Sequence, residues 1–113
     1  MMVFDKVTPY EVYYCDLPVM DNMMGGRRPV IIISNEKECL FSPNIMVVPC
    51  TTKIKRTDLP CNVLVNIDYT DTMVLCNQIT HIPKTYLREY VGRLSQKEVK
   101  EIKVALLTEL GFM

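Results

Sequence analysis

Short apolar segments separated by polar turns make up most of this chain. Segments of about four to eight residues that are rich in β-branched and aromatic side chains are typical of β-strands. The pattern predicts strands at residues 10–17, 28–35, 45–53, 62–67 and 72–82. In the second of these, the run Val30-Ile31-Ile32-Ile33 is continuous, which indicates burial on both faces of a sheet. Pro49 in the third indicates a sheet edge or a bulge, because proline cannot donate to the ladder.

The segments between these strands read as turns and loops. Residues 36–44 and 68–71 predict polar turns, and residues 54–61 predict a basic loop. Residues 18–26, "PVMDNMMGG", form a longer loop than most hairpins need. Because long loops in compact domains often carry function, we expect a role for this one.

The pattern changes after Pro83 and predicts helical structure. Proline at a first helical position predicts one or two helical turns in residues 83–90, followed by a short extended piece at 91–94. Ser95 and Glu98 have the spacing of a capping box. The apolar positions that follow, with helical spacing, are Val99, Ile102, Leu106 and Leu110. This stripe predicts an amphipathic helix, which Gly111 can end in the left-handed conformation.

The predicted elements define a mainly β protein. About five or six short strands with tight turns are typical of a small barrel, and the C-terminal helix would cover an open face or edge of it. The 113 residues, of which 49% are hydrophobic, suit a single domain over residues 1–113.

Charge and apolar run lengths limit the classes of function. Thirteen basic and thirteen acidic residues give no net charge, which argues against nucleic-acid binding over the whole surface but allows a local basic patch. The N-terminal segment lacks the features of a signal peptide, and the longest apolar run is too short to span a bilayer. We therefore expect a soluble, cytoplasmic protein with no membrane contact.

The cysteines predict reduced thiols rather than disulfides or a metal site. They are odd in number and lack C-x-x-C spacing: Cys15, Cys39, Cys50, Cys61 and Cys76. With a single histidine, His81, no metal ligand set is expected. A catalytic pair of a cysteine with His81 stays open, although no local motif supports it.

The stretch "MMGGRRPV", residues 23–30, is the main candidate for chemistry. Glycines allow a tight turn and close approach to another molecule, and the arginine side chain is a planar fork suited to phosphate. Arg27 and Arg28 can thus mark a phosphate site at the entrance of a buried strand. A plain turn with solvated charges is the alternative, because most surface arginines carry no special chemistry.

Several segments, in order, resemble one known family. They are "VYYCDLPVMDNMMGGRRPVIIISNE", "FSPNIMVVPCTTKIK", "NQITHIPKTYL" and "VGRLSQKEVKEIKVALLTELGF". Together they resemble the MazF/PemK-type toxins of type II toxin–antitoxin modules over residues 10–112. The most specific elements are G-G-x-R-P-V at the second strand, S-P-N before the third strand, and T-x-K after it.

The resemblance implies a fold, an activity and partners. The fold is a small SH3-like β-barrel of the CcdB/MazF type with a C-terminal helix, acting as a homodimer. The activity is sequence-selective cleavage of single-stranded RNA, chiefly mRNA, with no metal or other cofactor. The products carry a 2′,3′-cyclic phosphate and a 5′-OH end. A cognate antitoxin protein would bind the dimer and block the RNA groove.

The resemblance also implies roles for individual residues. Arg28 and Thr51 match the catalytic arginine and threonine of the family, whereas Arg27 falls on a variable position of the motif. The residues predicted to bind RNA are Arg27, Lys53, Lys55, Arg56, Gln78, Met23 and Asp21.

Two positions depart from the family pattern. Met23 stands where many members carry a glutamate, so nearby Asp21 is the remaining carboxylate candidate for a general base. His81 is a second candidate, because imidazole exchanges protons near neutral pH. Thr80 stands where the family has an arginine, which affects sequence preference or RNA affinity.

The departures keep two other functions open. The chain can be a catalytically inactive homologue that binds RNA or antitoxin. A gyrase poison of the CcdB type is the less favoured alternative, because those proteins use a C-terminal tryptophan and this chain contains none.

Overall fold

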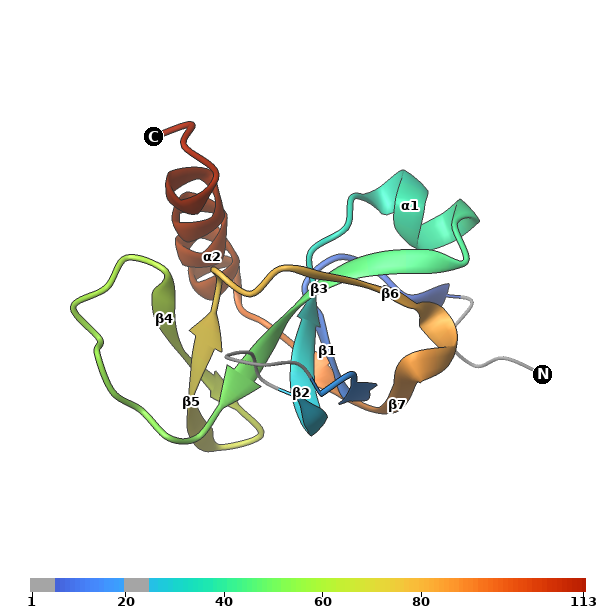
Figure 1. Ribbon diagram of the computed structural model, residues 1–113, viewed down its shortest axis with the longest axis horizontal. Helices are drawn as coiled ribbons and strands as arrows, with labels where there is room; N and C mark the ends of the chain where they lie inside the picture. The colour runs from blue at the N-terminus through green and yellow to red at the C-terminus, as the bar shows by residue number, and fades with distance from the viewer. Residues whose placement is uncertain (1–5, 20–24) are drawn as a thin grey trace.

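Antiparallel strands form one curled sheet, and two helices lie apart from each other against it (Figure 1). The computed structural model describes residues 6–19 and 25–113. The strands are β1 (Glu11–Leu17), β2 (Gly26–Ile32), β3 (Asn44–Thr51), β4 (Asn62–Ile67), β5 (Thr70–Leu75), β6 (Thr80–Pro83) and β7 (Leu87–Arg93). The helices are α1 (Glu36–Phe41), the short 3-10 helix η2 (Lys84–Tyr86) and α2 (Gln96–Glu109). The mainly β prediction with a C-terminal helix is confirmed.

Strand β3 is the centre of the sheet. The strand order is β4-β5-β3-β2-β1-β7, and β6 also pairs with β3. One edge of β3 pairs with β2 from Val47 to Pro49. The other edge pairs with β6 up to Val47 and then with β5 from Cys50. Pro49 lies in the gap between these two partners, so its missing N–H breaks no ladder there. The expectation of a bulge or edge at Pro49 thus becomes a change of partner inside the sheet.

The two faces of the sheet are buried in two apolar clusters. Val30 and Ile32 belong to one cluster, with Tyr13 and Cys15 of β1. Ile31 belongs to the other, with Val12, Val48 and residues of α2. Because side chains alternate along a strand, a continuous apolar run can serve both clusters. Burial of the run on both faces, as predicted, is confirmed.

The β4–β5 hairpin has a two-residue turn. Ile67 pairs with Thr70, and the two residues between them, Asp68 and Tyr69, have φ of 51° and 63°. Positive φ at both central positions is typical of a type I′ turn, whose twist matches that of the flanking strands.

Three segments differ from the sequence-based prediction. Residues 36–44, predicted as a turn, contain α1, whose N-cap Asn35 accepts a hydrogen bond from the Glu38 N–H at 2.9 Å. Residues 72–82, predicted as one strand, contain the separate strands β5 and β6. Residues 83–90, predicted as helical, contain only η2 before β7 begins. Pairing with β1 supplies the backbone of β7 with a ladder that local propensity does not reveal.

Helix α2 begins and ends as predicted, and most of its predicted apolar stripe packs against the core. Ser95 and Glu98 form the capping box, and Gly111 has φ of 84°. Ile102 and Ala105 are buried, whereas Leu110 is 57% exposed. Leu110, the last position of the predicted stripe, is exposed because the helix extends beyond the sheet at its C-terminal end (Figure 1). In the described ranges, no helix combines the length and apolar character needed to cross a membrane.

Glu98 links the start of α2 to β4. One carboxylate oxygen accepts a hydrogen bond from the Asn66 N–H at 2.8 Å, and the other accepts one from the Ser95 N–H at 3.0 Å. Partial burial favours the protonated carboxyl, but these hydrogen bonds outweigh it and hold the pKa of Glu98 below its ordinary value. A depressed folded-state pKa means that the charged form stabilises the fold.

We expect Glu98→Gln to lower the free energy of unfolding at pH 7 by roughly 0.5–1 kcal/mol. The difference from wild type should shrink as pH falls through the lowered pKa, because both side chains are then neutral. Urea unfolding at pH 7 and pH 3 measures this. Glu101→Gln is the matched control, since Glu101 lies exposed on the same helix. An equal loss at both pH values would contradict the assignment.

Candidate active site

Arg27 and Arg28 point to opposite faces of the sheet. Arg28 is level with Cys15 of β1, and Arg27 is level with Asp16. Alternation along β2 places Arg28 on the face that carries Val30, and Arg27 on the face that carries Ile31. The two adjacent cations therefore have different surroundings and cannot act as one pair.

The charge of Arg27 is compensated by carboxylates. Its Nε lies 3.2 Å from Asp16 Oδ1 and its Nη1 lies 3.4 Å from Glu89 Oε1. The other oxygen of Asp16 lies 2.8 Å from Arg88 Nη2. These exposed pairs join β2, β1 and β7 across one surface. The predicted RNA-binding role of Arg27 must therefore compete with two acidic neighbours.

Arg28 is held by backbone rather than by carboxylates. Its Nε donates a hydrogen bond to the Gly25 carbonyl oxygen at 2.9 Å. Pro29 restricts the backbone of Arg28 to the extended region. In the part of the chain that the structure describes, no acidic side chain forms an ion pair with Arg28. Among the described residues, its charge is therefore not compensated by a carboxylate.

Thr51 ends β3 on the same face as Arg28. The pairing of β2 with β3 ends at Val30 and Pro49, and Arg28 and Thr51 each lie two residues beyond this pair, so alternation along the strands places them on one face. Thr51 itself pairs with Met73 of β5. Its side chain is only 5% exposed, and its Oγ1 accepts a hydrogen bond from the Lys53 N–H at 3.1 Å. This bond orients the hydroxyl and leaves its proton as a donor.

The basic residues after Thr51 spread along an exposed loop. Lys53 is bonded through its backbone to Thr51, so it is next to the candidate site. Arg56 has φ of 52° and holds Asp58 through two hydrogen bonds, at 3.0 and 3.1 Å. The Arg56 guanidinium also lowers the pKa of the Asp58 carboxyl. The loop then turns away from β2 toward the start of β4 (Figure 1). Of the predicted cations in this loop, Lys53 thus lies nearest to Thr51 along the chain.

Gln78 and His81, also predicted from the sequence as site residues, lie on or beside other strands of the sheet. Gln78 is half-buried between β5 and β6, and its N–H donates to the Leu75 carbonyl at 3.1 Å. His81 pairs with Met46 on β3, five positions from Thr51, or roughly 16 Å along a strand. Its Nε2 lies 3.7 Å from Glu38 Oε2 of α1. His81 therefore belongs to a surface pair with Glu38 and lies away from the candidate site.

Some predictions lie outside the described residues. Asp21 and Met23, predicted to contact RNA, are in the segment 20–24. What sequence reasoning missed is the carbonyl of Gly25 as partner of Arg28, and the carboxylates around Arg27. The hairpin register of β1 and β2 is the signal that would have paired Asp16 with Arg27.

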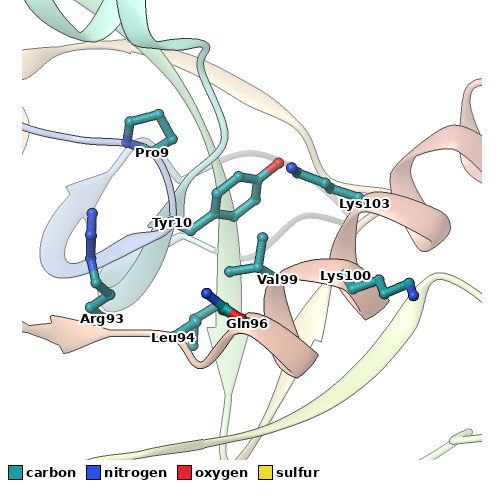
Figure 2. Close-up of a pocket in the computed structure, with 8 residues that line it drawn as sticks. All are labelled: Pro9, Tyr10, Arg93, Leu94, Gln96, Val99, Lys100 and Lys103. Carbon is teal, nitrogen blue, oxygen red and sulfur yellow. The ribbon is translucent and has the colours of Figure 1, made fainter.

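Two hollows of the surface flank α2, and neither is lined by Arg28 or Thr51. One cavity of about 460 Å³ lies between α2 and the turn before β1, with Tyr10 and Lys103 among its lining residues (Figure 2). Lys103 Nζ is 5.5 Å from the centre of the Tyr10 ring. Tyr10 precedes β1, whereas Arg28 is level with Cys15 near its other end. The cavity and the candidate site are therefore at opposite ends of β1.

The four buried cysteines are poor nucleophiles. Burial is the main cause that raises the pKa of Cys39 to about 11 and the pKa values of Cys15 and Cys76 to about 12. Burial also raises the pKa of Cys50. A protonated thiol does not attack, which argues against the cysteine–His81 pair. Within residues 6–19 and 25–113, no group of three or more His, Cys, Asp or Glu side chains is arranged to hold a metal ion.

Comparison with known proteins identifies the family. The model of the PemK-like, MazF-like toxins of type II toxin-antitoxin systems matches residues 8–110. The endoribonuclease MazF of Staphylococcus saprophyticus is 35% identical over 107 residues, covering 89% of this chain and 88% of that protein. The chain therefore belongs to the PemK-like, MazF-like toxin family, as the sequence resemblance predicted.

Solved structures agree with this assignment. An endoribonuclease from a mycobacterial species has a TM-score of 0.79 and 26% identity, with 97% of this chain and 96% of that chain covered. A mycobacterial endoribonuclease in complex with its cognate antitoxin has a TM-score of 0.80 and 28% identity, with 95% and 97% covered. The barrel expected from the resemblance is confirmed as the fold of this family.

We expect one fast-reacting thiol in the native protein. Cys61 is half-buried, whereas the other four cysteines are buried. Titration with a thiol reagent at pH 8 should therefore modify Cys61 rapidly, and all five thiols should react in guanidinium chloride. Cys61→Ser is the control and should remove the fast phase. A fast-reacting thiol that remains in Cys61→Ser would contradict the burial of the other four cysteines. It would also return a cysteine paired with His81 to the candidate nucleophiles.

Proposed function

We propose that this endoribonuclease toxin cuts single-stranded RNA, chiefly mRNA, at selected sequences, with the RNA's own 2′-hydroxyl as the nucleophile. The observation that carries the proposal is the common face of Arg28 and Thr51 at the adjoining ends of β2 and β3. The endoribonuclease relatives, similar over nearly the whole chain, support the same substrate.

The proposed step forms a bond from the 2′-oxygen to phosphorus and breaks the bond from phosphorus to the 5′-oxygen. The 2′-hydroxyl loses a proton to a base, and the leaving 5′-oxygen gains one. The products are a 2′,3′-cyclic phosphate and a 5′-OH end. Asp21 is the base that the sequence offers in this region.

Arg28 stabilises the charge that builds on the phosphate. With Nε bonded to Gly25, its terminal nitrogens can donate to two phosphoryl oxygens. Preorganised donors of this kind often supply the largest single contribution to catalysis. Thr51 can donate its hydroxyl proton to a phosphate oxygen or, less directly, fix the position of the Lys53 backbone. Neither role requires a metal, so we propose that cleavage proceeds in its absence.

Lys53 and Lys55 are the proposed contacts to the RNA backbone on the β3 side. Both are exposed and, in the described part of the chain, neither forms an ion pair with a carboxylate. Arg56 is engaged by Asp58, and Arg27 by Asp16 and Glu89, so each contributes less net positive charge. Phosphate contacts of this kind make RNA binding weaken with added salt.

A cognate antitoxin and a second copy of the chain are the proposed protein partners. The similar mycobacterial endoribonuclease with its antitoxin supports the first. The outer side and end of α2 support the presence of a protein interface, because large apolar side chains remain exposed there. They are Val104, Leu107, Leu110, Phe112 and Met113. An acidic, disordered antitoxin segment would compete with RNA for the basic residues.

We expect purified protein to cut a long RNA in EDTA and to leave 5′-OH ends. Arg28→Ala should lower the cleavage rate on the order of 100-fold to 1000-fold, because one preorganised donor is lost. Thr51→Val, which keeps the shape but loses the hydroxyl, should lower it less. Arg27→Ala is the matched control and should keep most of the activity. Primer extension maps the cuts, and circular dichroism checks the fold.

Other outcomes would select other functions. Folded Arg28→Ala with full activity would refute the proposed mechanism. Binding of RNA by the wild type without any product over long incubation would identify an inactive homologue. DNA breaks with gyrase in the absence of RNA cleavage would identify a gyrase poison.

We expect sedimentation at micromolar concentration to give a mass about twice 13.1 kDa. The exposed apolar side chains on α2 would then be partly covered in the dimer. A mass that stays at the monomer value over the whole concentration range would contradict the proposed homodimer.

A further inference from the structure

We propose that Gly25 is a positioning residue for RNA cleavage, because its missing side chain lets its carbonyl hold the guanidinium of Arg28. This inference rests on the function proposed above and explains why one arginine of the pair is kept available. It assigns a role to the first glycine of G-G-x-R-P that goes beyond flexibility.

The first observation is that Gly25 lies against the backbone of the end of β1. Leu17 and Gly26 are the last residues paired between β1 and β2, so Gly25 is level with Pro18. A Cβ atom on Gly25 would lie 2.7 Å from Val19 Cα and 2.9 Å from the Pro18 carbonyl oxygen. Both are backbone atoms, so no rotamer change relieves the contact. Any side chain at residue 25 must move the backbone itself.

The second observation is that this backbone carries the acceptor for Arg28. The Gly25 carbonyl lies 2.9 Å from Arg28 Nε, three residues along the chain. A bond at Nε fixes the plane of the guanidinium while both terminal nitrogens stay free to donate outward. The planar fork then meets a phosphate without first losing rotamer freedom. Displacement of the carbonyl would release that plane.

Arg27 shows the effect of anchoring an arginine by carboxylates instead of by a backbone carbonyl. Its Nε is bonded to the Asp16 carboxylate and its Nη1 to the Glu89 carboxylate, so its charge is compensated. A carbonyl can orient a guanidinium through a hydrogen bond but brings no net negative charge. Gly25 therefore anchors Arg28 without weakening its attraction for phosphate.

The test compares Gly25→Ala with Gly92→Ala in the full chain. A Cβ atom on Gly92 meets nothing within 4 Å, so this variant controls for the substitution itself. We expect Gly25→Ala to lower kcat roughly 10-fold to 100-fold with little change in KM, because small misplacements of a catalytic group cost rate. Gly92→Ala should keep wild-type kcat. Gly25→Ala that folds and has a kcat within about twofold of Gly92→Ala would overturn the proposal.

A double variant distinguishes an effect of Gly25 on the position of Arg28 from a general disturbance of the fold. Lysine has no Nε–H donor in the arginine position, so Arg28→Lys already lacks the anchor. If Gly25 acts through Arg28, adding Gly25→Ala to Arg28→Lys should lower kcat by less than about twofold. An additive loss in the double variant would show that Gly25 acts by another route.

NMR of the arginine side chains tests the anchor without using activity. The Nε–H signal of Arg28, assigned by its loss in Arg28→Lys, should exchange with water more slowly than that of Arg93. Equal exchange of the two signals in the wild type would overturn the proposal even if Gly25→Ala fails to fold. Failure of the proposed function is distinguishable, since the wild type would then not cut RNA while the Arg28 signal stayed protected.

Discussion

The ladder of β3 is the constraint on which the rest of this structure depends. One edge of β3 pairs with β2, and the other passes from β6 to β5 across Pro49. Nearly all of its side chains are buried, so its register cannot slip without exposing the core. Its last pair with β2 is Val30 with Pro49, and alternation beyond this pair places Arg28 and Thr51 on one face. The candidate site is therefore a consequence of the most buried part of the sheet.

The period of two along β2 separates adjacent arginines into different roles. Arg27 forms ion pairs with Asp16 and Glu89 at the surface. These pairs link β2 to β1 and β7 and compensate the positive charge of Arg27. Arg28 lies on the other face and is anchored by an uncharged carbonyl. Exposed ion pairs contribute little to stability, so the network matters more for electrostatics than for folding. A site that must attract phosphate benefits from one cation whose charge is not compensated.

Membership of the toxin family agrees with the placement of Arg28 and Thr51 on one sheet. The elements of the motif that carry the resemblance map onto a loop end, a strand start and a strand end of one sheet. The candidate base in the segment 18–26, Asp21, lies outside the described residues. The roles of Arg28 and Thr51 in cleavage accordingly stay predictions that rest on geometry and on resemblance.

The sequence by itself determined the elements whose signals are local. The run Val30-Ile31-Ile32 marks a strand buried on both faces, and Ser95 with Glu98 marks the start of α2. It also determined the family, because motifs such as G-G-x-R-P occur along the chain in the order typical of that family. Tertiary structure decided what depends on distant partners. Residues 87–90 became a strand because β1 lies beside them, and Leu110 stayed exposed because the sheet ends before it does. The different surroundings of Arg27 and Arg28 were likewise decided by strand pairing, since the carboxylates and the carbonyl that select between them are brought near only by folding.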